Sequence, residues 1–383
     1  MKPLSVYVHI PFCMKKCNYC DFLSAPATRE RQEAYIAALC LEIEQEEKSY
    51  VNHVVQTIFI GGGTPSILTG EDISRIFRTL KQNYKFADNP EITIEVNPGT
   101  VTGEKLQDYR QAGINRLSIG LQSAMDNELR ALGRIHNYSD FLNTYNDAVK
   151  SGFNNINIDL MSAIPEQTMD SYLATLHSVT ELKPAPTHIS AYSLIVEEGT
   201  PFYENTPELP DEDTERGLYK ITNVFLGERG YHRYEISNYA KSGYECKHNQ
   251  VYWRRGDYVG FGLGAASLVN NTRFSNSREF ESYVNQKASN TIKVESRQVL
   301  TLQEQMEEFM FLGLRMMSGV SKREFENLFG QSIDQVYPEL VEKLIGEGLL
   351  KRLTITETGD ERIALTDFGI DVSNQVMAEF LLS

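Results

Sequence analysis

The chain has 383 residues, which is enough for two or three domains around a large core. Its hydrophobic, aromatic and charged fractions are 41%, 10% and 23%, all ordinary values for a globular protein. The formal net charge of −15 argues against a general nucleic-acid-binding protein, which would carry a basic face, so we expect no nucleic-acid partner.

The N-terminus, Met-Lys-Pro-Leu-Ser, lacks the apolar segment and the small-residue cleavage site of a secretory signal peptide. No apolar run in the sequence approaches 18 residues, so no membrane span is predicted. We therefore expect a cytoplasmic protein whose thiols are reduced.

Short apolar runs alternate with longer helical patterns over the first 230 residues. The runs are rich in β-branched residues and typical of buried parallel strands; they occupy 6–10, 57–61, 92–96, 116–120, 156–160 and 188–194. Helices are predicted over 29–46, 70–84, 102–113, 138–153, 169–182 and 213–230. Six consecutive strand–helix units predict a parallel α/β sheet, either open or closed into a barrel.

Residues at the expected helix ends support these boundaries. Thr102, Ser139 and Thr168 are candidate N-caps, because their hydroxyl groups can accept from the first free N–H groups of a helix. Gly113 and Gly152 stand where helices often end in a left-handed residue.

Three of the five cysteines, Cys13, Cys17 and Cys20, follow the first predicted strand with the spacing C-x3-C-x2-C. A structural zinc site would need a fourth ligand. Candidates for it are His9, Cys40, Cys246 and His248. A [4Fe-4S] cluster held by three cysteines would instead leave one iron without a protein ligand, so that another molecule can bind there. The spacing alone leaves both kinds of metal site open.

Glycines and polar residues follow the other predicted strands, where ligands bind in parallel α/β folds. The run 61–63 is Gly-Gly-Gly, which permits close backbone approach to a ligand but is also found in flexible turns. Glu95, Gln122 and Asp159 can accept hydrogen bonds from hydroxyl or ammonium groups. Arg134 is suited to binding a carboxylate, although a surface arginine is an equally ordinary interpretation.

Taken together, several segments resemble the radical S-adenosylmethionine (radical SAM) superfamily. They are YVHIPFCMKKCNYC, GGGTPS, IEVNPG, GINRLSIGLQS, LGRIHN and HISAYSLIVEEGTPFY. The likeness is greatest to the branch of oxygen-independent coproporphyrinogen III dehydrogenases and HemW-type haem chaperones. It is dense over the first two-thirds of the chain and implies a partial (β/α)6 radical SAM barrel.

The resemblance also implies roles for particular residues. Cys13, Cys17 and Cys20 would hold a [4Fe-4S] cluster whose open iron binds S-adenosylmethionine. The methionine and adenosine side would be lined by Tyr7, Gly62, Gly63 and Thr64. The ribose and methionine portion would be surrounded by Glu95, Gln122, Arg134 and Asp159, with Arg134 at the carboxylate. In the family, the cluster's electron cleaves the sulfonium to give a 5′-deoxyadenosyl radical; whether this chain cleaves the cofactor or only binds it stays open.

Three features resemble the chaperone branch more than the dehydrogenases. The dehydrogenases carry a further cysteine two residues after the last cluster cysteine, where this chain has Phe22, and an extension ahead of the cluster strand. The segment HNQVYW (248–253) resembles the H-N-x-x-Y-W signature of the chaperones, whose histidine is thought to help bind haem. His248 is therefore a candidate haem ligand and Cys246 a second, although a lone histidine in such a segment is also typical of a structural residue.

The resemblance thus implies a haem chaperone that binds the cluster, S-adenosylmethionine and haem and passes haem to a client protein. A respiratory, membrane-associated client would bring the protein to the membrane surface through that partner. A homodimer is compatible with this hypothesis. The alternative function is an oxygen-independent coproporphyrinogen III dehydrogenase.

We predict a radical SAM core over 1–235, a connecting segment with the HNxxYW motif over 236–298, and a C-terminal domain over 299–383. Helices are predicted in the C-terminal domain over 301–316, 321–330 and 332–348, followed by two strands within 349–369. This order is similar to an α+β winged-helix arrangement. The apolar stripe of 301–316 is expected to pack against the barrel or to cover a cofactor, and we expect the domain to serve in docking or as a lid.

Overall fold

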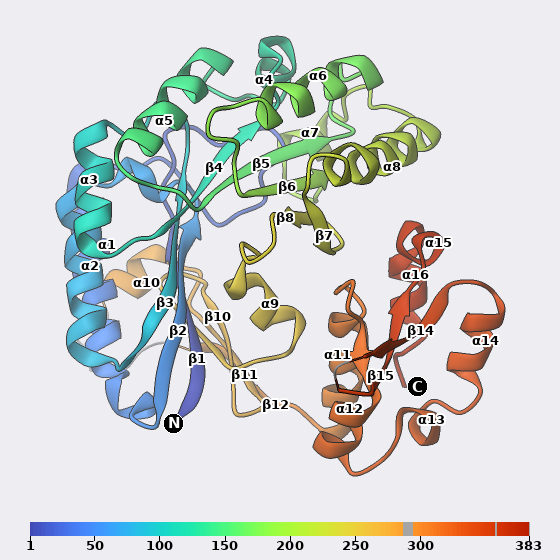
Figure 1. The fold of residues 1–383 in the computed structure, drawn as a ribbon. Helices are drawn as coiled ribbons and strands as arrows, with labels where there is room; N and C mark the ends of the chain where they lie inside the picture. The colour runs from blue at the N-terminus through green and yellow to red at the C-terminus, as the bar shows by residue number, and fades with distance from the viewer. Residues whose placement is uncertain (286–293, 357, 383) are drawn as a thin grey trace.

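The structure is a computed structural model that describes residues 1–285, 294–356 and 358–382. A long curved sheet forms its centre, and helices cover the outer face of this sheet (Figure 1). A smaller unit, formed by the C-terminal part of the chain, lies on the inner side of the sheet, with the short helix α9 (Lys247–Trp253) between the two parts (Figure 1).

The sheet is built around six parallel strands that pair in chain order. They are β1 (Lys2–Ile10), β2 (His53–Gly62), β3 (Phe86–Val96), β4 (Arg116–Gln122), β5 (Ile156–Ser162) and β6 (His188–Ser193). Each contains or nearly coincides with one of the predicted apolar runs. The predicted parallel α/β sheet is therefore confirmed, and its curvature is that of a partial barrel (Figure 1).

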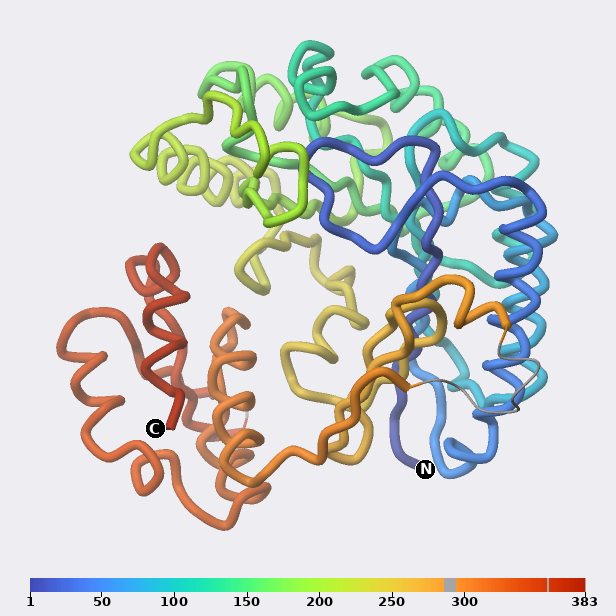
Figure 2. The backbone as a smooth tube through the Cα atoms, turned by 180° about the vertical axis from the view of Figure 1, so that it is seen from behind, coloured from blue at the N-terminus to red at the C-terminus, as the bar shows by residue number. Residues whose placement is uncertain are grey.

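Further strands, which were not predicted from the sequence, extend both edges of this parallel core. Beside β1 follow β9 (Tyr258–Phe261), β10 (Ala266–Val269), β11 (Thr272–Asn276) and β12 (Val294–Val299). Beside β6 follow β8 (Asn238–Ala240) and β7 (His232–Glu235). β9 runs parallel to β1, so a late segment of the chain returns beside its N-terminus (Figure 2).

The helices that join the parallel strands pack on the outer face. They are α1 (Arg29–Gln45), α2 (Gly70–Asn83), α3 (Gly103–Ala112), α5 (Tyr138–Lys150), α6 (Met169–Thr180) and α8 (Glu212–Gly227). Shorter helices lie at the loops: α4 (Asp126–Ala131), α7 (Pro201–Glu204), α10 (Phe280–Val284), and the 3₁₀ turns at Glu47–Tyr50 and Pro65–Ile67. In the part of the chain that the structure describes, no helix has the length and apolarity needed to cross a bilayer.

Two predicted helix boundaries differ from the structure. Asn137, not Ser139, is the N-cap of α5, because its side chain and that of Asp140 form a reciprocal capping box. The helix predicted over 332–348 is broken into α13 (Ile333–Val336) and α14 (Leu340–Gly346), because Pro338 cannot continue a helix. Thr102, Thr168 and Gly113 cap their helices as predicted.

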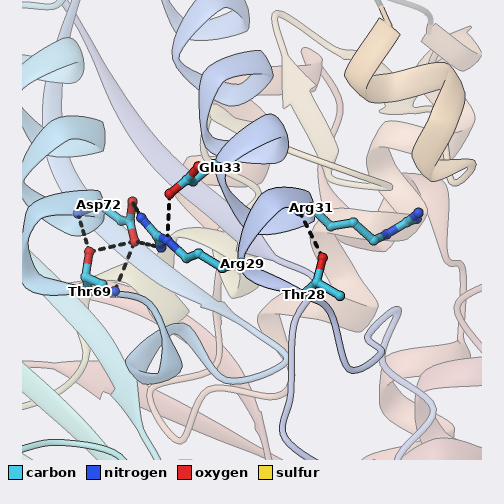
Figure 3. A network of polar contacts seen from close by, with 6 residues as sticks. All are labelled: Thr28, Arg29, Arg31, Glu33, Thr69 and Asp72. Carbon is cyan, nitrogen blue, oxygen red and sulfur yellow. Dashed lines mark hydrogen bonds and ion pairs between the residues drawn. The ribbon is translucent and has the colours of Figure 1, made fainter.

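A bidentate ion pair joins the first turns of α1 and α2 (Figure 3). Arg29 donates to both carboxylate oxygens of Asp72, one of them at 3.0 Å. The same carboxylate accepts from the backbone N–H and hydroxyl of Thr69, which caps α2. Asp72 thus stabilises the start of one helix and fixes its position against the next.

Alternation along the strands divides the side chains of the sheet into two sets. In β4, Leu117, Ile119 and Leu121 belong to the large apolar core beneath the outer helices. Arg116 and Ser118, together with Gly120 and Gln122 farther along the strand, instead border a pocket on the inner side. Because strand side chains alternate between faces, the outer face builds the core and the inner face is free to carry polar groups.

The C-terminal unit has an apolar core of its own. Its elements are α11 (Leu302–Gly313), β13 (Val320–Ser321), α12 (Lys322–Phe329), α13, α14, β14 (Leu350–Ile355), β15 (Asp360–Leu365), α15 (Asp367–Asp371) and α16 (Ser373–Ala378). The strands form an antiparallel sheet in the order β13-β15-β14. The stripe predicted to pack against the barrel, with Phe309 and Met310, lies mainly in this separate core, so that expectation was wrong.

Two ion pairs, one of them largely buried, connect the C-terminal unit to the sheet. Glu308 in α11 accepts from Arg255 and from Arg273, each at 2.9 Å. The backbone N–H of Met317 donates to the carbonyl of Tyr234 in β7 at 3.0 Å. Specific polar contacts therefore hold the C-terminal unit against both ends of the sheet.

Candidate functional site

A pocket of about 440 Å³ extends from the carboxyl ends of the parallel strands into the inner side of the sheet. This volume is within the range usual for small-molecule sites. The structure brings most of the predicted site residues to its wall: Cys13, Cys17, Cys20, Gly62, Gly63, Thr64, Glu95, Gln122, Arg134 and Asp159. They come from four neighbouring strands, β2 to β5, and from loops beyond the strand ends, so the site depends on the strand order of the barrel.

The cysteine loop, residues 11–28, crosses the mouth of this pocket between β1 and α1. Backbone bonds close the loop on itself: Cys13 N donates to Ala25 O at 3.2 Å. Another bond attaches it to the end of β2, where Thr64 N donates to Phe12 O at 2.6 Å. The position of the thiols is therefore set by the backbone of two neighbouring strand ends.

The three thiols are free, and all of them border the same pocket. An all-sulfur donor set suits an iron–sulfur cluster, and three thiols leave one iron open. Among the described residues, no three His, Cys, Asp or Glu side chains converge closely enough to hold a single metal ion. The donor set and its place beside a ligand-sized pocket fit the [4Fe-4S] cluster that the motif implies.

Two glycines at the end of β2 permit its close contact with β1 and with the start of the cysteine loop. Gly62 has φ +112°, and a Cβ there would lie 2.6 Å from the ring of His9. A Cβ on Gly63 would lie 2.5 Å from the carbonyl oxygen of Phe12, which is fixed by its bond from Thr64. The glycine run is therefore a packing requirement beneath the cysteine loop, beyond a merely flexible turn.

Two carboxylates, Glu95 and Asp159, line the same pocket. Burial, and after it the charge of Asp159, raise the pKa of Glu95 to about 8, against a hydrogen bond from Gly62 N that lowers it. Burial also raises the pKa of Asp159, although it accepts from Ser118 and Asn157. Glu95 is thus largely protonated at neutral pH, and a hydroxyl or cationic ligand group beside it would favour its ionised form.

Arg134 lies at the mouth of the pocket, beside the cysteine loop. Its Nη1 donates to the sulfur of Cys17 at 3.7 Å. Its Nη2 donates to the side chain of Asn97 at 2.7 Å and to the carbonyl of Gly120 at 2.9 Å. The guanidinium is therefore held facing the site, which is unlike a mobile surface arginine.

Several other polar residues border the pocket, most of them deeper in the barrel, and the sequence did not single them out as site residues. The missed pocket residues include Asn97, Arg116, Ser118, Asn157, Ser190, Tyr192 and Asn249. The strand residues among them could have been found from the spacing of two, since 116, 118, 120 and 122 must share one face of β4.

Tyr7 and His248 are the predicted site residues that the structure does not place on the pocket wall. Tyr7 bonds to Nδ1 of His9 at 2.9 Å and stacks on Phe59, which does line the pocket. His248 is 1% exposed, and its two ring nitrogens bond to Thr57 and to Tyr252, each at 2.8 Å. Both therefore lie behind the wall, in its supporting layer.

Comparison with known proteins agrees with this geometry. The model of the Radical SAM superfamily matches residues 7–179, and the model of the HemN C-terminal domain matches residues 300–371. Heme chaperone HemW of Haemophilus influenzae is 39% identical over 100% of this chain and 98% of its own length. Heme chaperone HemW of Lactococcus lactis is 36% identical over 100% of this chain and 98% of its own length. The chain belongs to the HemW family of the radical SAM superfamily.

A solved structure supports the same conclusion for the fold. Coproporphyrinogen III oxidase (HemN) from Escherichia coli, a radical SAM enzyme, has a TM-score of 0.85 and 25% identity, covering 99% of this chain and 90% of that chain. The predicted radical SAM barrel with a separate C-terminal α+β region is confirmed, as is the family. Membership of this superfamily implies a [4Fe-4S] cluster and S-adenosylmethionine as cofactors.

The contact beneath the cysteine loop predicts the effect of Gly63→Ala. Because the new Cβ would press on the Phe12 carbonyl, we expect the loop to shift and the iron bound per protein after anaerobic reconstitution to fall at least threefold. Gly103→Ala is the control, since a Cβ there meets nothing within 4 Å. Equal iron content in both variants would contradict the close-packed loop.

The raised pKa of Glu95 predicts a pH-dependent effect of Glu95→Gln on stability. The folded value of about 8 exceeds the ordinary 4.5, so the folded protein binds this proton more tightly and loses stability as pH rises between these values. At pH 8 we expect Glu95→Gln to raise the free energy of unfolding by about 2–4 kcal/mol, and at pH 5 by little. Urea denaturation at pH 5 and at pH 8 measures these differences in the free energy of unfolding. Glu204→Gln, at an exposed position, is the control. A difference that does not change with pH would contradict the burial argument.

Proposed function

We propose that the protein is a haem chaperone that binds a [4Fe-4S] cluster, S-adenosylmethionine and haem, and delivers haem to client haem proteins. The observation that carries the proposal is similarity to heme chaperones over essentially the full length of both chains. Phe22 gives further support, because it borders the pocket where the dehydrogenase pattern has an additional cysteine.

In this proposal, Cys13, Cys17 and Cys20 hold the cluster at the mouth of the pocket. Arg134 binds the carboxylate of S-adenosylmethionine, and its bonds to Asn97 and Gly120 fix its direction. The nucleoside part of S-adenosylmethionine forms hydrogen bonds with the rest of the polar wall, which consists of Gly62, Gly63, Thr64, Glu95, Gln122 and Asp159. When bound, the cluster and S-adenosylmethionine supply one-electron chemistry, and the enclosed walls restrict access of water to them.

Haem ligation by His248 stays a prediction, and the structure shows what it would require. Burial, and after it the charge of Arg116, lower the pKa of His248 to about 3, so the imidazole is neutral as haem iron requires. However, Tyr252 would have to leave the ring before iron could bind. Cys246 is also fully buried, with its thiol directed at Glu91.

We also propose a cytoplasmic location, with contact to the membrane only through a haem-accepting partner. The net charge of −15 supports the absence of a nucleic-acid partner. A homodimer remains compatible with the proposal, and size-exclusion chromatography of the reconstituted protein would establish the oligomeric state.

The second candidate is an oxygen-independent coproporphyrinogen III dehydrogenase. The observation that favours it is the close structural similarity to a coproporphyrinogen III oxidase over 99% of this chain. Such an enzyme would use the same cofactors but would have to hold its substrate within reach of S-adenosylmethionine in the pocket.

One anaerobically reconstituted preparation can separate these functions. We expect iron and acid-labile sulfide, a stoichiometric Soret shift on haem titration, and transfer of the haem to an apo-acceptor. The same preparation, given S-adenosylmethionine, a reductant and coproporphyrinogen III, should form no protoporphyrinogen. Protoporphyrinogen formation would establish the second candidate, an absent Soret shift would remove the first, and zinc without sulfide would remove both.

The buried position of His248 predicts a stability effect of His248→Ala. Loss of two hydrogen bonds and of packing should lower the free energy of unfolding by about 2–4 kcal/mol, measured by urea denaturation. The exposed His177→Ala should change it by less than about 0.5 kcal/mol. Haem titration of the folded variants then tests ligation: an unchanged haem affinity in His248→Ala would exclude His248 as an axial ligand.

A further inference from the structure

Arg116 is a buried cation that the rest of the described chain does not pair. It is the first residue of β4, is 1% exposed, and borders the pocket. Its Nε has no hydrogen-bond partner among the described residues, and no carboxylate in that part of the chain forms an ion pair with it. Unpaired buried charges are rare in proteins because desolvation is costly, so this guanidinium calls for a partner that the chain does not supply.

The carboxylates whose charges act on Arg116, Glu91 and Asp159, have other partners. Glu91 accepts from the first two backbone N–H groups of α9 at 3.0 and 2.9 Å. Asp159 accepts from Ser118 Oγ at 2.9 Å and from Asn157 Nδ2 at 2.8 Å. These charges offset that of Arg116 over a distance, but neither gives it the direct contact that a guanidinium usually makes with a carboxylate.

The position of Arg116 separates it from the cofactor part of the pocket. It lies on the same strand and face as Gly120, whose carbonyl binds Arg134 at the mouth. Four residues of a strand span about 13 Å, so the backbone of Arg116 lies well below the cysteine loop. The pocket thus has one guanidinium at its mouth and another at its floor, with Glu95 and Asp159 between them.

We propose that the floor of the barrel is a second binding compartment, in which Arg116 pairs with a carboxylate group of a ligand other than S-adenosylmethionine. Asn249, the second residue of the HNQVYW segment, borders the same pocket and brings an amide donor to it. Resting on the proposed function, the source of this carboxylate is a propionate arm of the tetrapyrrole. A small free dicarboxylate shares the chemistry, and the experiment distinguishes the two sources.

The test compares haem with haem dimethyl ester, in which both propionates are blocked, by Soret titration of reconstituted protein. We expect the unchanged protein to bind haem at least tenfold more tightly than the ester. Arg116→Gln should abolish this difference and Arg116→Lys should keep part of it. The matched control Arg110→Gln, at an exposed position of α3, should behave as the unchanged protein.

The second part of the test uses succinate as the probe. Its binding is measured, in the absence of haem, as a shift of the melting temperature of the protein. If haem and its ester bind alike, but succinate stabilises the unchanged protein and not Arg116→Gln, the compartment takes a free dicarboxylate. If neither probe depends on Arg116, the proposal is overturned. If the unchanged protein binds no haem, the proposed function fails, while the succinate arm still decides the role of Arg116.

Thermal melts of the ligand-free variants test whether Arg116 has a purely structural role. Because Arg116 has no direct partner to lose, we expect Arg116→Gln to melt within a few degrees of the unchanged protein. A large fall in melting temperature for both Arg116→Gln and Arg116→Lys would mark a structural cation and would contradict the proposal.

Discussion

The alternation of side chains along the parallel strands is the constraint on which the rest of the structure depends. It directs Leu117 and Ile119 into the core beneath the helices and leaves Arg116 and Ser118 on the inner side. Burial of the outer set supplies the favourable free energy of folding. The inner set can therefore be polar and even charged without loss of the fold, and this is what makes the barrel interior a ligand site.

The ionisable groups of that interior make only part of their possible hydrogen bonds and ion pairs within the protein. Arg134 has three acceptors, and Asp159 has two donors. Glu95 receives a single bond from Gly62 N, and Arg116 receives no direct partner from the described residues. A buried polar group without a full set of partners destabilises the ligand-free protein. It gains the most free energy when a ligand supplies the missing hydrogen bonds or charge, and this relates the electrostatics of the pocket to its use in binding.

The HNQVYW segment links the floor of the pocket to the rest of the molecule. His248 ties α9 to β2 through Thr57, and Glu91 of β3 accepts from the start of the same helix. The next residue, Asn249, borders the pocket. The segment therefore has a physical role as a support of the barrel interior, independent of whether its histidine ever ligates haem.

The sequence by itself determined the parallel α/β sheet, most helix ends and the cysteine motif, because these depend on local patterns of apolar residues, caps and spacing. It also indicated strand-end residues such as Glu95, because parallel strands end at one edge. Arg134, which lies beyond α4, was indicated by the family resemblance. Only the tertiary structure decided that Arg116 and Asn249 share a pocket, that His248 lies behind its wall, and that α11 packs in a separate core. Those outcomes depend on contacts between residues far apart in the chain, for which no local pattern exists.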